Sequence, residues 1–358
     1  MRIFNSNLKI IGQISFVIIF LSTTSANSLD KFNKADRISN YFSGILLLNN
    51  NQYDDSFNSF KKLNGLEISH ENYSKKFLYS LVNSGNLKEA FNYSKKLERK
   101  KLDIFESDLI MGIYYLKELN LDLAQKYFLK AKSRNSKFIL NNYVSKSLFN
   151  WSTFGNINLK QATIEIEKLD KRFENLKKIQ NVFLNCYFSS KDTGLLFNKL
   201  ISNEKTDFSR YNYFYAKYLF DQGEKIKARK IVDISLKKYP RNLLLNQYKI
   251  NLDLKKNFSE FSCKNKKEII AELLYIAANA LSSQSYFQAS NFYLNLSKNL
   301  NKNFHSFDTL LAENFYNSQD LESSKKIYQN LRKNGTAFKW YSDKQISRIL
   351  ISKDKKSE

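Results

Sequence analysis

The polar and apolar positions of this chain recur with a fixed period across its first half. Small residues stand at Ser56, Ala90 and Ala124, at intervals of 34 residues. Two further sets of small or apolar residues keep the same interval: Gly44, Leu78 and Gly112, and Leu63, Leu97 and Ala131. A period of this length is typical of stacked helix–turn–helix units, each of which buries its apolar face only against its neighbours.

Within each unit, the helical spacing of apolar residues is interrupted by a short polar turn. The first three units begin near Arg37, Glu71 and Phe105, and the second has its turn at residues 83–86. The small residues let the two helices of a unit approach closely, and the larger apolar residues fill the remaining space. The pattern therefore predicts pairs of antiparallel helices.

The pattern continues less regularly as far as residue 256. A fourth unit slips by four residues and has Ala162 at its small position, and a degenerate fifth unit covers residues 177–204. The sixth unit is clear again at Ala228 and ends at Pro240, where a ring that cannot continue a helix is useful. Residues 242–256 predict a first helix whose second helix is missing.

A polar segment without helical periodicity, residues 257–267, separates these units from two more. The later units carry small residues at Ala289 and Ser324, and a further helix begins near Lys339 and runs towards Ile351. We expect the polar segment to be a seam between two runs of repeats.

The last residues, 353–358, resemble the turn that precedes a second helix in the earlier units. We therefore expect the chain to be truncated at its C-terminus, with a frayed, charged tail as the alternative. The preceding helix carries Phe338, Trp340, Ile349 and Ile351, which is too apolar for a terminal unit with a polar outer face. We expect it to present a contiguous exposed apolar patch.

The composition agrees with an all-α protein. One proline and nine glycines are too few to form the many turns that a sheet requires. Hydrophobic residues make up 42% of the chain, which is enough for a continuous core. We predict an all-α fold, an α-solenoid of helix–turn–helix repeats that forms a superhelix.

The third unit shows the fullest version of the pattern, with Gly112, Tyr115, Ala124, Phe128 and Ala131. These residues resemble the tetratricopeptide repeat (TPR) family, whose units keep Gly, Tyr, Ala, Phe and Ala at the same offsets. The resemblance implies a superhelix in which the first helices of successive units line a concave groove, and that groove holds an extended peptide or a partner helix.

Carried over to this chain, the resemblance implies a set of groove-facing residues, most of them aromatic. These candidates are Tyr41, Tyr79, Trp151, Tyr213, Lys217, Phe220 and Tyr316. Aromatic and cationic side chains suit a partner with apolar anchors and some negative charge. The alternative is that these side chains pack between the units.

Residues 1–26 have the features of a secretory signal. Arg2 and Lys9 form a positive segment, an apolar stretch runs from Ile10 to Leu21, and small residues precede a cleavage site after Ala26. The apolar stretch is shorter than the ~20 residues that cross a bilayer as a helix. We expect export to the periplasm or cell envelope of a bacterium, with an uncleaved N-terminal anchor as the alternative.

These features divide the chain into four parts. We expect a signal peptide at 1–26, about six TPR-like repeats plus an extra helix at 29–256, the polar seam at 257–267, and further repeats at 268–358.

The net charge of +24 invites a comparison with nucleic-acid binders. Only ten of the 58 basic residues are arginine, however, and arginine makes the bidentate contacts with phosphates and bases. Export would also separate the protein from nucleic acid. We expect no nucleic-acid partner, and we consider a weak association with anionic envelope surfaces.

The chain has two cysteines, Cys186 and Cys263. A disulfide requires Cα atoms within about 7 Å. Because these residues belong to different units of an extended stack, we expect each to be a small buried hydrophobic residue, with a disulfide as the alternative.

The sequence contains no motif for catalysis, metal binding or a cofactor. Its two histidines, His70 and His305, lie at the edges of units and outside any metal-ligand spacing. We therefore predict a non-catalytic scaffold of the bacterial envelope that binds a protein or peptide partner in the groove, without cofactors or metals. The alternatives are a glycan-active or glycan-binding helical protein of the cell wall, which would need two carboxylates for hydrolysis, and a basic adaptor for anionic envelope surfaces.

Overall fold

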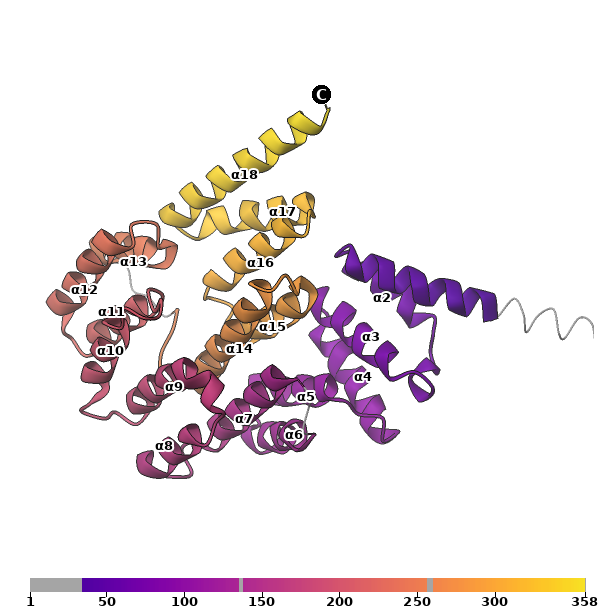
Figure 1. The fold of residues 1–358 in the computed structure, drawn as a ribbon, viewed down its shortest axis with the longest axis horizontal. Coiled ribbons are helices and arrows are strands. Elements are labelled where there is room, and N and C mark those ends of the chain that lie inside the picture. Colours follow the sequence, from indigo (N-terminus) through magenta and orange to yellow (C-terminus); the bar gives the residue numbers. More distant parts are fainter. Residues whose placement is uncertain (1–33, 135–137, 256–259, 358) are drawn as a thin grey trace, which may run out of the picture. The chain divides into compact units, whose positions relative to one another are not determined.

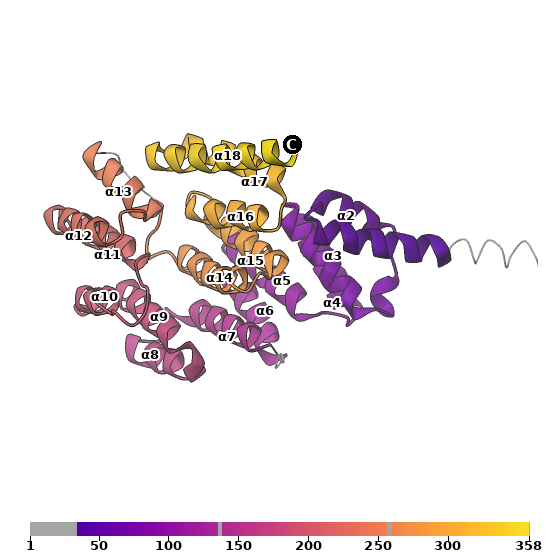
Figure 2. The ribbon, with the colours of Figure 1, turned by 45° about the horizontal axis from the view of Figure 1, so that its top comes forward.

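The computed structural model describes residues 34–134, 138–255 and 260–357, and within these ranges the secondary structure is helical, with no strand. Figures 1 and 2 show the helices from two directions. The expected signal peptide lies outside the described residues. The chain divides into two compact units, Met1–Ser80 and Leu81–Glu358.

In the first unit, a helix over residues 34–49 packs on α2 (Tyr53–Lys61), followed by the short η1 (Leu66–Ile68) and the start of α3 (Glu71–Asn83). A side chain at Gly44 would collide with Phe60, since its Cβ would lie 2.6 Å from the Phe60 ring. The Ser56 hydroxyl donates to the Gly44 carbonyl at 2.8 Å. The expected close crossing at these small residues is confirmed.

The second unit contains the end of α3 and all later helices, which mostly pack as consecutive pairs. They are α4 (Leu87–Arg99), α5 (Phe105–Lys117), α6 (Leu121–Ser133), α7 (Ile139–Thr153), α8 (Leu159–Glu167), η2 (Lys171–Phe173), α9 (Glu174–Tyr187), α10 (Thr193–Ile201), α11 (Tyr211–Asp221), α12 (Lys225–Lys238), α13 (Leu243–Asp253), α14 (Lys266–Ser282), α15 (Phe287–Leu300), α16 (Ser306–Asn317), α17 (Leu321–Leu331), η3 (Arg332–Asn334) and α18 (Thr336–Ser357). These pairs confirm the predicted all-α solenoid of TPR-like repeats.

The turn between paired helices has a repeating backbone geometry. A residue in the left-handed conformation stands five positions before the small residue, as at Gly85 (φ 84°) before Ala90 and Leu119 (φ 61°) before Ala124. The same arrangement recurs at Asn51, Ser189, Gly223, Ser285 and Gln319. The turn backbone is therefore kept even where the residue is not glycine.

The seventh helix pair, α14 and α15, corrects the expected register by one residue. Ser290, which is fully buried, donates its hydroxyl to the Ala278 carbonyl at 2.8 Å, and Ala289 is only partly buried. Ser324 repeats this bond to Ala312 at 2.9 Å. The choice of Ala289 was wrong because several alanines lie within one or two positions of the true crossing, and serine fits it equally well.

The second unit also contains contacts between helices that are far apart in the sequence. Helix α14 packs on α7, α15 packs on α5, and α13 packs on α18 (Figures 1 and 2). Helix α13 has no second helix in its own repeat, and it packs on the C-terminal helix α18 instead. Neighbour-only stacking, which the repeat period predicts, does not describe this part of the chain.

Cys186 and Cys263 form a disulfide, with their Cα atoms 5.9 Å apart. The expectation of two separate thiols was wrong because it placed the cysteines in distant units of an extended stack, whereas the seam returns to the end of α9. Lys264 strengthens this junction, since its Nζ donates to the carbonyls of Cys186 at 2.6 Å and Tyr187 at 3.0 Å.

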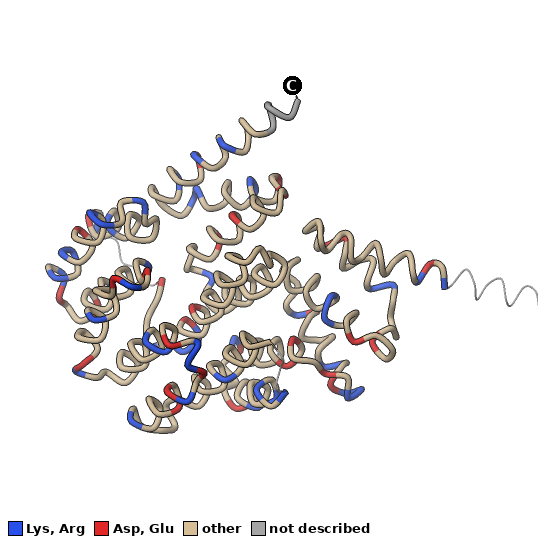
Figure 3. The backbone as a smooth tube through the Cα atoms, viewed as in Figure 1, with Lys and Arg blue, Asp and Glu red and all other residues tan. Residues whose placement is uncertain are grey.

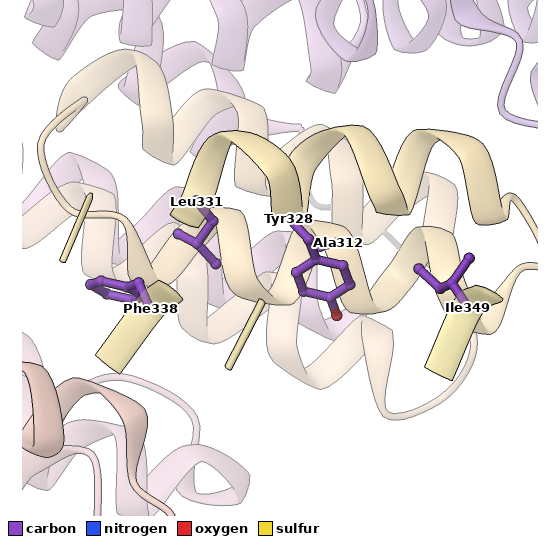
Figure 4. Close-up of a cluster of buried hydrophobic side chains, with 5 residues drawn as sticks. All are labelled: Ala312, Tyr328, Leu331, Phe338 and Ile349. Carbon is purple, nitrogen blue, oxygen red and sulfur yellow. The ribbon is translucent and has the colours of Figure 1, made fainter. Parts of the chain in front are cut away.

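Helix α18 buries some of its apolar residues, and those that remain exposed do not form one patch. Phe338 and Ile349 join a buried cluster with Ala312, Tyr328 and Leu331 (Figure 4). The exposed apolar residues of α18 are Trp340 near one end and Leu350 and Ile351 near the other. They are about 15 Å apart along the helix, so the expected contiguous patch is not formed.

We expect Gly85→Ala to lower the free energy of unfolding by about 1 kcal/mol, because alanine is disfavoured at a left-handed position. No atom lies within 4 Å of the missing Cβ, so the effect would come from the backbone alone. Urea denaturation measures it. Gly194→Ala is the matched control, since its Cβ would make an ordinary 3.8 Å contact with Tyr218. Equal stability of Gly85→Ala and the wild type would contradict the turn geometry.

Candidate binding cavity

Arg210, the residue before α11, joins three segments of the second unit. Its Nε and Nη2 donate to the two carboxylate oxygens of Glu272 on α14, at 2.7 and 2.8 Å. Its Nη1 donates to Ser306 Oγ at the start of α16, at 2.6 Å. Because these partners lie 62 and 96 residues further along the chain, one side chain fixes the relative positions of α11, α14 and α16.

The surroundings of this ion pair are aromatic. The guanidinium carbon of Arg210 lies 3.8 Å from the centre of the Tyr275 ring and 5.2 Å from that of Phe304. Glu272 is completely buried, and this burial raises its pKa, which Arg210 opposes. The Glu272 carboxylate in turn raises the pKa of Arg210, so the guanidinium stays charged.

A cavity of about 260 Å³ opens above Arg210. It lies where the ends of several helices converge, and its wall combines polar groups with apolar side chains. The lining consists of Arg210, Asn242, Leu243, Leu244, Tyr275, Asn279, Ser306, Thr309, Leu310, Glu313 and Phe338. Helices α13, α14, α16 and α18 therefore all contribute to it.

Helix α16 contributes two polar groups to the cavity that a ligand could bind. Glu313 accepts a hydrogen bond from the Tyr341 hydroxyl at 2.5 Å, forms no ion pair with any described residue, and burial raises its pKa. The Thr309 hydroxyl is buried without a hydrogen-bond partner in the described part of the chain. Three of the five N–H donors of Arg210 bond Glu272 and Ser306. On the α16 side, the cavity offers a carboxyl group and an acceptor, which suit a hydrogen-bond donor or a cation.

Four of the predicted groove residues are buried in the interior. Trp151 is fully buried and donates its Nε1 to Gln180 at 3.0 Å. The Tyr213 ring lies 5.1 Å from that of Tyr248. The other two are Lys217, paired with Asp221 at 2.5 Å, and Tyr79 of the first unit. In this conformation these side chains pack between helices, which is the alternative that the sequence left open.

The other three predicted groove residues keep part of their surface. Tyr41 lies in the first unit, Phe220 on α11 and Tyr316 on α16, and none of them lines the cavity. Their contact with a partner stays a prediction. Family offsets identify the first helices but cannot tell which of their sides remains open.

Sequence reasoning missed the residues that form the cavity. Glu272 gave a usable signal, since it is a single carboxylate within the apolar run of residues 269–278, and such a residue is almost never buried unless it is paired. Glu313 gave a similar signal, since it is the one charged residue within residues 309–319, whereas Arg210 follows Asp207 and Ser209 in a polar stretch and gave none. The described residues hold no group of three potential metal ligands.

No protein-family model matches this chain, and no curated protein matches it either. Among solved structures, the chain is similar to one in the Cut9–Hcn1 hetero-tetramer of APC/C, at 15% identity and a TM-score of 0.30, with 83% of this chain and 52% of that one covered. A chain of Naa15/Naa10 bound to HypK-THB matches at 12% identity and a TM-score of 0.34, with 83% of this chain and 53% of that one covered. Yeast Tom70 matches at 12% identity and a TM-score of 0.29, with 91% of this chain and 97% of the Tom70 chain covered.

The chain thus spans about half the length of the first two of these proteins. The TPR-like architecture rests on the helix pairs, their 34-residue spacing and their repeated small-residue crossings.

We expect Arg210→Leu alone, or Glu272→Leu alone, to lower the free energy of unfolding by about 3–5 kcal/mol, because either change leaves a buried charge without its partner. The double variant should recover most of this loss. Urea denaturation monitored by circular dichroism measures all three. Glu165→Gln, which breaks an exposed pair with Lys168, is the control and should change stability by less than about 1 kcal/mol. A double variant less stable than both single variants would contradict this account.

The raised pKa of Glu313 predicts a pH dependence. A carboxyl with a raised folded-state pKa stabilises the fold below its unfolded pKa of about 4.3, and this contribution is lost as the pH rises through the folded pKa. We therefore expect the wild type to lose stability relative to Glu313→Gln as the pH rises from about 4 to about 7. Urea midpoints across this range measure the difference. A constant difference across this range would contradict the assignment.

Proposed function

We propose that this protein is a non-catalytic scaffold that binds a segment of a protein partner, one side chain of which enters the cavity above Arg210. The convergence of α13, α14, α16 and α18 with Arg210 on one cavity carries this proposal. At about 260 Å³ the cavity is smaller than the roughly 300–1,000 Å³ of most small-molecule sites. A single side chain therefore suits its size better than a cofactor does.

The cavity chemistry favours a lysine or arginine side chain as the anchor. Glu313 is a carboxyl group without a cationic partner among the described residues, and Thr309 has a free acceptor beside it. A cationic donor would satisfy both groups and would offset the cost of keeping a carboxylate out of water. An acidic anchor would instead place two like charges together.

Hydrolysis of a glycan fits this cavity less well. Both common mechanisms need a pair of carboxyl groups on either side of the bond that is cleaved. Among the described residues that line the cavity, Glu313 alone carries a carboxyl group, because Glu272 lies behind Arg210 and is bonded to it. This observation supports the non-catalytic part of the proposal.

We further propose that the protein acts in the envelope of a bacterium after export. Two observations support this location. Residues 1–26 have the pattern of a secretory signal. The Cys186–Cys263 disulfide suits an oxidising compartment, since disulfides are rare in cytosolic proteins.

The test compares partner binding by the wild type and by variants of the cavity. Partners retained from an envelope extract would be identified by mass spectrometry, and their binding segments measured as peptides by calorimetry. We expect Thr309→Trp, which fills the cavity, to abolish binding, and Glu313→Gln to weaken it about tenfold or more through loss of the charged pair. Replacing the basic anchor of the peptide with glutamine should have the same effect as Glu313→Gln.

Glu204→Gln removes an exposed carboxylate in the loop after α10 and is the matched control. It should bind as the wild type does, and thermal melts should show that all variants remain folded. Full binding by a folded Thr309→Trp variant would overturn the proposed site.

A further inference from the structure

The outward face of α12 differs from an ordinary solvated helix. Ala228, Val232 and Ser235 point inward and are buried. With 3.6 residues per turn, the opposite side of the helix carries two isoleucines and two lysines. Those residues, which we call the α12 face, are Ile226, Lys230, Ile234 and Lys237.

Both isoleucines of the α12 face are exposed, and Ile226 is more exposed than any other large apolar side chain of the described residues. Ile226 is 87% exposed and Ile234 is 54% exposed, and they stand two turns apart on the same side of the helix. Together they expose apolar surface to water. Their spacing allows both to contact one flat surface.

The positive charges of the two lysines on the α12 face are not neutralised by ion pairs. Lys230 and Lys237 form no ion pair with any described residue, and α12 as a whole has six basic residues and one acidic residue. That acid, Asp233, already binds Lys249 at 2.7 Å. Figure 3 shows the resulting concentration of basic positions along α12. The α12 face therefore combines positive charge with exposed apolar side chains.

Helix α17 provides a comparison within the same unit. It is also the second helix of a repeat, and its exposed side carries lysines and other polar residues, Lys325 and Lys326 among them. All residues of α17 are described, and none of its large apolar side chains is exposed. The exposed, lysine-bearing side of α17 thus carries no exposed isoleucine. Exposure to solvent alone therefore does not explain the isoleucines of the α12 face.

We propose that the α12 face docks on an anionic lipid bilayer. Isoleucines in one plane can enter the boundary between headgroups and acyl chains, and lysines bury their aliphatic stems there while their ammonium groups reach lipid phosphates. Nucleic acid would use the lysines but would leave both isoleucines in water. The combination therefore favours a lipid surface.

The geometry of α12 fits docking in the plane of the membrane. Its 14 residues span about 21 Å, and its buried side stays anchored to α11 while the opposite side makes contact. No helix among the described residues has the length and apolar character to cross a bilayer. The α12 face shares no residue with the cavity above Arg210, so the two proposals can be tested independently.

Sedimentation with vesicles tests this proposal directly. The purified chain would be mixed with vesicles of equal parts phosphatidylglycerol and phosphatidylcholine, and with vesicles of phosphatidylcholine alone. We expect binding to the anionic vesicles only. Ile226→Ser with Ile234→Ser, and separately Lys230→Gln with Lys237→Gln, should each reduce the apparent affinity about tenfold or more.

Two control variants separate docking by α12 from attraction by the net charge. Lys325→Gln with Lys326→Gln removes the same charge from α17, and Leu195→Ser removes an exposed leucine from α10. Both should bind nearly as the wild type does, and circular dichroism should show unchanged helicity in all variants. Equal losses on α17 and α12 would overturn the proposal. Loss with the lysine variant but not the isoleucine variant would indicate a general polyanion surface and would also overturn it.

Discussion

The buried ion pair between Arg210 and Glu272 is the constraint on which the second unit depends. Taking both charges out of water is expensive, and the cost is offset only while the bidentate geometry and the contact with Ser306 are kept. Helices α11, α14 and α16 must therefore hold their mutual positions. The cavity lies beside this guanidinium, where the helices meet.

The repeat pattern predicted the local structure well and the long-range structure poorly. Small residues such as Ala124 and Ser324 must lie at helix crossings wherever they recur, since nothing larger fits, so the helix pairs could be derived from spacing. A 34-residue period describes contacts between adjacent units only. It contains no information about α7 on α14, or about the return of Cys263 to α9.

The candidate site lay beyond prediction for the same reason. Its polar groups come from positions 210, 272, 306 and 313, which no motif connects, and their proximity follows from the closure of the second unit. The resemblance to TPR proteins selected Trp151 and Tyr213, which would face an open groove in a simple stack. Here both are buried: Trp151 donates to Gln180 on α9, and Tyr213 lies beside Phe304, which comes from a distant repeat.

The contact between α13 and α18 has a consequence for how this protein unfolds. A simple repeat stack behaves as a one-dimensional chain of neighbours, so its ends can fray while the middle remains intact. In the second unit, helices near the C-terminus are supported by helices from the middle of the chain. Loss of one repeat then removes contacts from a distant one, and the unit should melt as a single cooperative block rather than repeat by repeat.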